Sequence, residues 1–162
     1  MSAWILVAGV GNVFFGDDGF GPAVAQRLRT VELPPGVDVR EFGIRGIHLA
    51  YELLDGPQLL IVADAVSRGG APGTLYVLEP EVDGTPGQAD AHQMDLGSVF
   101  AAVRAMGGSM PRVRIVGCEA ESTEPGMSLS PRVEQAVDEA VRLILELLQH
   151  ERAPVGAMEK RP

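Results

Sequence analysis

Two short, almost wholly apolar runs constrain the fold of this chain more than any other feature. Residues 4–10 read Trp-Ile-Leu-Val-Ala-Gly-Val, and residues 59–62 read Leu-Leu-Ile-Val. A strand that is apolar on both sides has to be covered on both faces, as strands of a parallel sheet are. We therefore expect both runs to form buried strands with helices packed on either side of them.

The rest of the sequence alternates between strand-like and helix-like segments. Further strands are predicted at 37–42, 73–79 and 112–117, and helices at 22–30, 47–54, 96–106 and 130–149. The turn at 68–73 is too short for a crossover helix, so the strand after it is expected to run antiparallel. This order predicts an α/β fold, a three-layer α/β/α sandwich of the phosphorylase/hydrolase-like kind with a five-stranded mixed sheet. We expect residues 1–150 to form a single domain and residues 151–162, rich in charge and proline, to be a disordered tail.

The apolar spacing within the helices groups side chains by face. In the second helix Ile47, Tyr51 and Leu54 fall on one face, and in the third helix Val99, Phe100 and Val103 are predicted to face inward. The last helix carries one long apolar stripe between Val133 and Leu148.

Composition and charge exclude several classes of protein. The formal net charge of -9 argues against nucleic-acid binding, which needs a basic surface. A single cysteine excludes an internal disulfide and indicates a reducing compartment. The first residues lack the basic segment of a signal peptide, and no apolar run reaches the roughly 18 residues of a membrane helix. We therefore expect a cytoplasmic protein with no membrane partner.

The loop after the first strand, residues 9–21, is rich in glycine and contains two adjacent acids. Its opening glycines suggest a dinucleotide-binding loop, but Phe14 stands where the third glycine of Gly-x-Gly-x-x-Gly is required. Phosphate would also meet Asp17 and Asp18 at the start of the following helix, where free amide donors are needed. Nucleotide binding is therefore disfavoured.

Three aspartates are the main candidates for chemistry. Asp17 is expected to cap the helix or brace the loop, which leaves Asp18 freer to face a cleft. Asp64 directly follows an apolar strand, where a carboxylate is costly unless it is paired or used. The carboxyl ends of strands are also where ligands bind in open α/β sheets. At this stage Asp64 is equally consistent with an active-site acid and with a buried acid that accepts loop amides.

The histidines and the cysteine give weaker signals. His150 is expected to be exposed near the end of the last helix, and His48 is either a capping or a substrate-facing residue. His92 lies in a loop, and its importance depends on whether Asp18 and Asp64 are neighbours. Cys118 ends a buried strand and is interpreted as a core residue rather than a nucleophile.

Four glycines in the loops have two interpretations. They would allow an extended peptide to approach the backbone closely, or they would simply permit tight strand-to-helix turns. The four are Gly9, Gly11, Gly43 and Gly46.

Five motifs, in order along residues 4–148, resemble those of the hydrogenase maturation endopeptidases. They are Gly9-Val10-Gly11-Asn12 followed by Asp17-Asp18-Gly19-Phe20-Gly21, Gly43-x-x-Gly46, Ile61-Val62-Ala63-Asp64-Ala65, Ala91-His92-Gln93, and Met127-Ser128-Leu129-Ser130-Pro131. The resemblance implies an α/β/α sandwich with a five-stranded mixed sheet. It also implies an endopeptidase that removes a C-terminal extension from the large-subunit precursor of a nickel-iron hydrogenase after nickel has been inserted.

The resemblance further assigns three residues as catalytic residues and nickel ligands: Asp18, Asp64 and His92. Alignment on Gly19-Phe20-Gly21 selects Asp18 rather than Asp17, although this position is often glutamate in the family. Two carboxylates and an imidazole suit a borderline divalent ion such as nickel. The nickel is expected to arrive in the precursor, with weak or no binding to the free protein. We also expect a monomer without a resident cofactor.

The mechanism and a second function stay open. A carboxylate could act as general base on water, or the metal could polarise the scissile carbonyl. Alternatively, the chain recognises the metallated subunit without cutting it, as a nickel-binding chaperone or checkpoint protein. The sequence contains no His-Glu-x-x-His motif, so a zincin is excluded.

Overall fold

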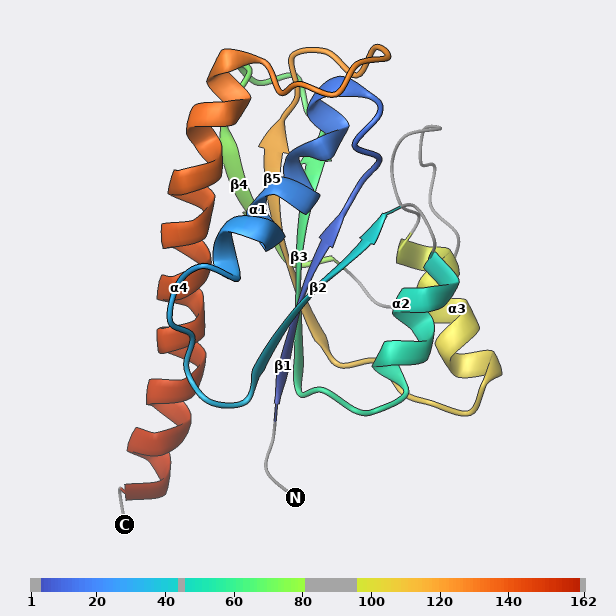
Figure 1. Cartoon of the computed structure of the whole chain (residues 1–162). Coiled ribbons are helices and arrows are strands. Elements are labelled where there is room, and N and C mark those ends of the chain that lie inside the picture. Colours follow the sequence, from blue (N-terminus) through green and yellow to red (C-terminus); the bar gives the residue numbers. More distant parts are fainter. Residues whose placement is uncertain (1–3, 44–45, 81–95, 161–162) are drawn as a thin grey trace.

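The computed structural model describes residues 4–43, 46–80 and 96–160, with side chains up to Glu151. Strands and helices alternate within these ranges (Figure 1). The strands are β1 (Ile5–Val10), β2 (Val37–Gly43), β3 (Leu59–Val66), β4 (Leu75–Leu78) and β5 (Arg112–Glu119). The helices are α1 (Phe20–Leu28), α2 (Gly46–Leu53), α3 (Leu96–Ala105) and α4 (Pro131–Lys160), and a short 3-10 helix, η1 (Gly16–Gly19), precedes α1.

The strands form one five-stranded mixed sheet in the order β2-β1-β3-β5-β4. Neighbouring strands from β2 to β5 run parallel, and β4 pairs with β5 antiparallel. The antiparallel direction of β4 was predicted from the short turn between β3 and β4, which leaves no room for a crossover. The predicted fold class is therefore confirmed.

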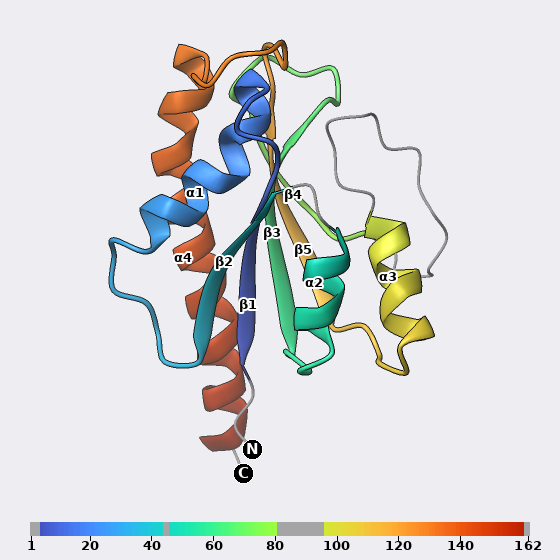
Figure 2. The same ribbon diagram turned by 45° about the vertical axis from the view of Figure 1, so that its right-hand side comes forward.

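Helices cover the sheet on both faces, with α1 and α4 on one side and α2 and α3 on the other (Figure 2). Side chains of the central strands alternate between the two cores. Ile5 and Val7 of β1 belong to the α1/α4 core, whereas Leu6 and Ala8 belong to the α2/α3 core. Because each face of β1 and β3 is buried, these strands carry the uninterrupted apolar runs seen in the sequence.

Apolar spacing predicted the buried faces of α3 and α4 but not that of α2. Ile47, Tyr51 and Leu54 do share a face, but this face is exposed, with relative exposures of 48%, 58% and 37%. The buried set is Leu49, Ala50 and Leu53. In a helix of two turns both sets have helical spacing, so the packing against α3 and the sheet decides which set is buried.

Two strands extend further than the sequence predicted. β3 continues to Val66 and β5 to Glu119, and these two residues are paired in the parallel register. Asp64 therefore lies inside β3 rather than after its end. Its neighbour Ala65 is buried in the α1/α4 core, which accounts for the extra strand length.

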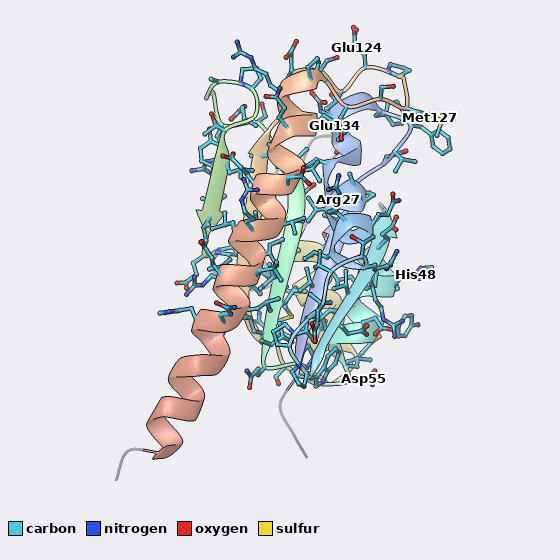
Figure 3. All side chains as sticks on the ribbon, turned by 60° about the vertical axis from the view of Figure 1, so that its left-hand side comes forward. Arg27, His48, Asp55, Glu124, Met127 and Glu134 are labelled. Carbon is cyan, nitrogen blue, oxygen red and sulfur yellow. The ribbon has the colours of Figure 1, made fainter. Side chains whose placement is uncertain are left out.

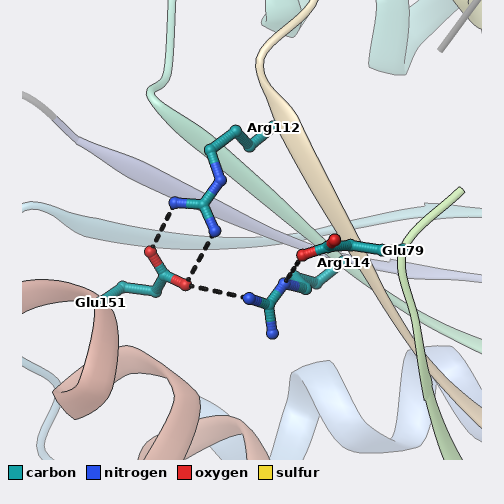
Figure 4. Close-up of polar contacts among 4 residues, drawn as sticks. All are labelled: Glu79, Arg112, Arg114 and Glu151. Atoms are coloured by element: carbon teal, nitrogen blue, oxygen red, sulfur yellow. Dashed lines mark hydrogen bonds and ion pairs between the residues drawn. The ribbon is translucent and has the colours of Figure 1, made fainter. Parts of the chain in front are cut away.

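Helix α4 extends to Lys160, whereas the sequence predicted a helix to about Gln149 and a disordered tail. The backbone of residues 151–160 is thus helical. Glu151, the first residue of this stretch, is held to the sheet, because its carboxylate pairs with Arg112 at 2.8 Å and with Arg114 at 3.5 Å (Figure 4). Arg114 also pairs with Glu79 at 2.7 Å, so α4 is linked at Glu151 to β5 and to the residue that follows β4. None of the helices in the described ranges has an apolar stretch that would cross a membrane.

Replacing Glu151 with alanine should lower the free energy of unfolding by about 1–2 kcal/mol, because a nearly buried carboxylate that accepts two bonds from one guanidinium is lost. Urea unfolding of both proteins measures the difference. The control is Arg27→Ala, which removes an ion pair between two exposed side chains, Arg27 (48% exposed) and Asp138 (53% exposed). That variant should cost less than about 1 kcal/mol. Equal effects in the two variants would refute a special role for Glu151.

Candidate active site

Asp18 is buried at the carboxyl edge of the sheet, in η1 between β1 and α1. Its side chain is 1% exposed, and one carboxylate oxygen, Oδ2, accepts a 2.7 Å hydrogen bond from the backbone amide of Asn12. The side chain of Asn12 in turn accepts a 2.9 Å bond from the amide of Phe14. The loop thus holds the carboxylate of Asp18 through its own backbone.

Asp17 is equally buried but serves the loop 120–130, which crosses the same edge of the sheet. Its Oδ2 accepts the amides of Glu121 and Ser122 at 2.8 and 3.0 Å. Its Oδ1 accepts the amide of Ser130 at 2.7 Å, and the Ser130 hydroxyl contacts both oxygens. The predicted bracing role of Asp17 is confirmed. Ser130 belongs to the Met127–Pro131 motif quoted above, but no pattern in the sequence predicted its contact with Asp17.

Asp64 lies in β3 opposite Gly117 of β5 and is partly exposed. The alternation of β3 places its side chain on the α2/α3 face, with Leu60 and Val62. η1 contacts β3, and the start of α1 rests directly on the strand ends. A Cβ on Gly21 would collide with the carbonyl oxygen of Ala63, the residue before Asp64. The structure therefore brings the segments that carry Asp18 and Asp64 together at one edge.

The third predicted ligand, His92, lies outside the described residues, so its place beside the two acids stays a prediction. Among the described residues no three histidine, cysteine, aspartate or glutamate side chains are grouped so as to hold a metal ion. The other two histidines are exposed. His48 projects from α2 toward solvent (Figure 3), and His150 lies on α4 as predicted.

The structure separates the four glycines for which two interpretations were open. At Gly9, Gly11 and Gly46 a side chain would meet protein atoms already in place, so these glycines serve close packing within the fold. Gly43 differs, because no described residue lies within 4 Å of the position that its Cβ would occupy. Its φ of 59° also favours glycine, so Gly43 leaves backbone open to an approaching ligand.

A fourth acid at this edge, Glu119, was not singled out in the sequence. It is 4% exposed and accepts hydrogen bonds from the Tyr76 hydroxyl at 2.9 Å and from the amides of Arg68 and Gly70. Burial disfavours its charged form, but these hydrogen bonds outweigh burial and lower the pKa of the carboxyl. Like Asp64, Glu119 stands at the end of a mostly apolar run. The rule applied to Asp64, that a carboxylate in such a place is costly unless it is paired or used, would have identified it. Its partners assign it to holding the turn after β3.

Because the pKa of Glu119 is lowered on folding, its stabilising effect should be complete above its unfolded pKa of about 4.3 and should be lost as the pH falls further. We expect Glu119→Gln to be less stable than the wild type at pH 7 by about 1–2 kcal/mol, and this difference to shrink toward pH 3. Urea unfolding at several pH values measures it. Glu124→Gln, at an exposed loop position, is the control without such a trend. A difference that does not change with pH would contradict the role of the charge.

Cys118 is a core residue, as predicted. It is fully buried on the α1/α4 face. Burial and the nearby carboxylates of Asp17 and Glu119 raise the pKa of its thiol to about 12. The thiol is therefore protonated near neutral pH and does not act as a nucleophile in this structure.

These features define a class of protein: an α/β/α sandwich whose candidate site is built from carboxylates at the ends of parallel strands, not from a thiol.

Comparison with known proteins narrows this class. Residues 22–147 match the family model described as hydrogenase maturation protease. The chain is 32% identical over 148 residues to the hydrogenase 2 maturation protease of Escherichia coli K12, an alignment that covers 90% of each chain. A putative hydrogenase maturation protease of Methanocaldococcus jannaschii is 35% identical over 149 residues, covering 87% of this chain and 94% of that one.

Solved structures agree with this result. The hydrogenase-maturating endopeptidase of E. coli superposes with a TM-score of 0.80 at 32% identity, covering 91% of this chain and 93% of that one. A nickel-iron hydrogenase maturation protease of Thermococcus kodakarensis gives a TM-score of 0.74 at 27% identity over 91% and 93% of the two chains. The chain belongs to the hydrogenase maturation protease family, and it is a peptidase.

Proposed function

We propose that this peptidase removes the C-terminal extension from the nickel-loaded large-subunit precursor of a nickel-iron hydrogenase. The observation that carries the proposal is the meeting of the Asp18 and Asp64 segments at one edge of the sheet, in a member of a protease family. The names of the relatives support it, since the E. coli protein is named for the maturation of hydrogenase 2.

In this proposal nickel belongs to the substrate and serves as the recognition element. Asp18, Asp64 and His92 offer two oxygen donors and one nitrogen donor, and the remaining coordination positions stay with the ligands of the precursor. Asp18 is held rigidly by the Asn12 amide and suits the role of a fixed ligand. Asp64 is partly exposed and is therefore the better candidate to meet an attacking water.

The reaction needs a water molecule to attack the scissile carbonyl while a base takes its proton. The carboxylate of Asp64 can act as this base, and the proton then passes to the leaving amine. Alternatively, nickel in the precursor polarises the carbonyl and Asp64 acts only as a ligand. Both routes use the same residues, and both predict that nickel-free precursor is not cut.

The test is to mix the protein with nickel-loaded and with nickel-free precursor and to follow the mass of the large subunit. Release of the C-terminal peptide from the loaded form alone is the expected result. Release from neither form would refute the proposed cleavage. Stable binding of the loaded form without release would instead support a chaperone or checkpoint protein. We place the reaction in the cytoplasm, as expected from the use of a single cysteine in the sequence.

A further inference from the structure

An open groove of about 390 Å³ runs along the outside of the loop that follows β1. Apolar side chains form most of its walls, namely Val13, Phe14, Pro22 and Phe42. The groove extends to the end of β2, where Gly43 lines it. Volumes of about 300–1,000 Å³ are typical of small-ligand sites, so the groove can hold a few residues of an extended chain.

The groove is directly connected to the candidate active site. Asn12 lines the groove and donates its backbone amide to the Asp18 carboxylate at 2.7 Å. The amide of Phe14 bonds to the Asn12 side chain at 2.9 Å. Two hydrogen bonds therefore link the loop that forms the aromatic wall of the groove to the carboxylate of Asp18.

The charges around the groove indicate what it accepts. Among the described residues that line it, the one acidic side chain is that of Glu41, which pairs with Arg29 at 2.8 Å and so adds no unpaired charge. The acids of the site and the net charge of -9 repel an acidic segment. Phe14 is 60% exposed, so its ring is open to a ligand in the groove. Because the apolar walls disfavour burial of a charge of either sign, an uncharged, apolar segment fits best.

Backbone geometry fits an extended chain. The open space at Gly43 allows another backbone to approach closely. Within the described residues β2 is an edge strand, paired with β1 on one side only. The outer hydrogen-bonding groups of such a strand can pair with an added extended peptide.

We propose that this groove binds the uncharged, extended stretch of the precursor next to the scissile bond, with one apolar side chain packed against Phe14. The inference rests on the proposed function, because it takes the precursor as the substrate. It adds a specificity-determining surface that is separate from the nickel ligands. In this arrangement nickel selects the nickel-loaded precursor, and the groove orients its scissile peptide bond.

Three variants test the groove with nickel-loaded precursor as substrate. Phe14→Ala should raise KM about tenfold and leave kcat nearly unchanged, because an aromatic contact made before the reaction is lost. Phe14→Leu retains apolar bulk and should restore most of the affinity. Tyr51→Ala is the matched control, since Tyr51 is 58% exposed but lies outside the groove. An unchanged KM in Phe14→Ala would overturn the proposal.

A photocrosslinking amino acid at position 14 gives a readout that does not depend on cleavage. Crosslinks from position 14 should map to the residues flanking the cleavage site, whereas crosslinks from position 51 should not. Crosslinks from position 14 that all map elsewhere would refute the groove, even if the wild type cuts the precursor normally. If the wild type releases no peptide, the proposed function fails, and crosslinking still decides whether the segment occupies the groove.

Discussion

Replacing Asp64 with asparagine is expected to slow peptide release from nickel-loaded precursor by about 10²- to 10⁴-fold without unfolding the protein. Asparagine has nearly the shape of aspartate, and the side chain is only partly buried in β3. The amide cannot take a proton from water near neutral pH, and it is a weaker donor to a divalent ion than a carboxylate. The rate is measured by mass spectrometry, and a urea unfolding curve monitors the fold.

The control is the same substitution at Asp55, an exposed aspartate at the opposite end of the molecule from the loop that carries Met127 (Figure 3). Asp55→Asn removes the same charge from the protein but should leave the rate unchanged. Equal rates in wild type and Asp64→Asn would remove Asp64 from the active site. Equal losses in both variants would point to the overall charge of the protein instead.

The sheet could be predicted because its central strands obey a simple physical rule. Strands covered on both faces must be apolar, and β1 meets this condition throughout, while β3 meets it from Leu59 to Ala63, before Asp64. The buried face of α2 did not follow from local pattern, since Ile47, Tyr51 and Leu54 are as apolar as the buried set. Only the tertiary packing distinguishes the two sets. The ion pair between Glu151 and Arg112 likewise joins residues that are distant in sequence, so no local pattern predicts it.

The candidate site was only partly accessible from the sequence. The placement of Asp64 at the carboxyl edge followed from the end of an apolar run. The sequence only weakly predicted that Asp17 braces the loop while Asp18 faces the cleft, because adjacent acids at a helix start share the same local pattern. The structure separates them through residues more than 100 positions away, namely the partners of Asp17 at 121, 122 and 130. No pattern of short range encodes such contacts.

Replacing Asp17 with alanine is therefore expected to lower the free energy of unfolding by about 3 kcal/mol or more, a large share of a typical domain's stability. The Asp17 carboxylate, 1% exposed, accepts three backbone amides and one hydroxyl, and alanine removes the acceptor of all four donors at once. Urea unfolding at pH 7 measures the loss. A change below about 0.5 kcal/mol, the range of ordinary surface substitutions, would contradict the bracing role.

Two milder variants give an order that only this hydrogen-bond arrangement predicts. Asp17→Asn must turn its NH₂ group toward at least one backbone amide, because both carboxylate oxygens accept such amides. Its cost should lie between that of Asp17→Ala and that of Ser130→Ala, which removes a single hydroxyl donor worth about 1 kcal/mol.

Asparagine at position 17 and asparagine at position 18 separate the two neighbouring acids by function. When Asp17→Asn is folded at low temperature with a stabilising osmolyte, it should cleave the precursor measurably. Asp18→Asn should fold under the same conditions and show no cleavage. The reverse outcome would make Asp17 the active-site acid and Asp18 the brace.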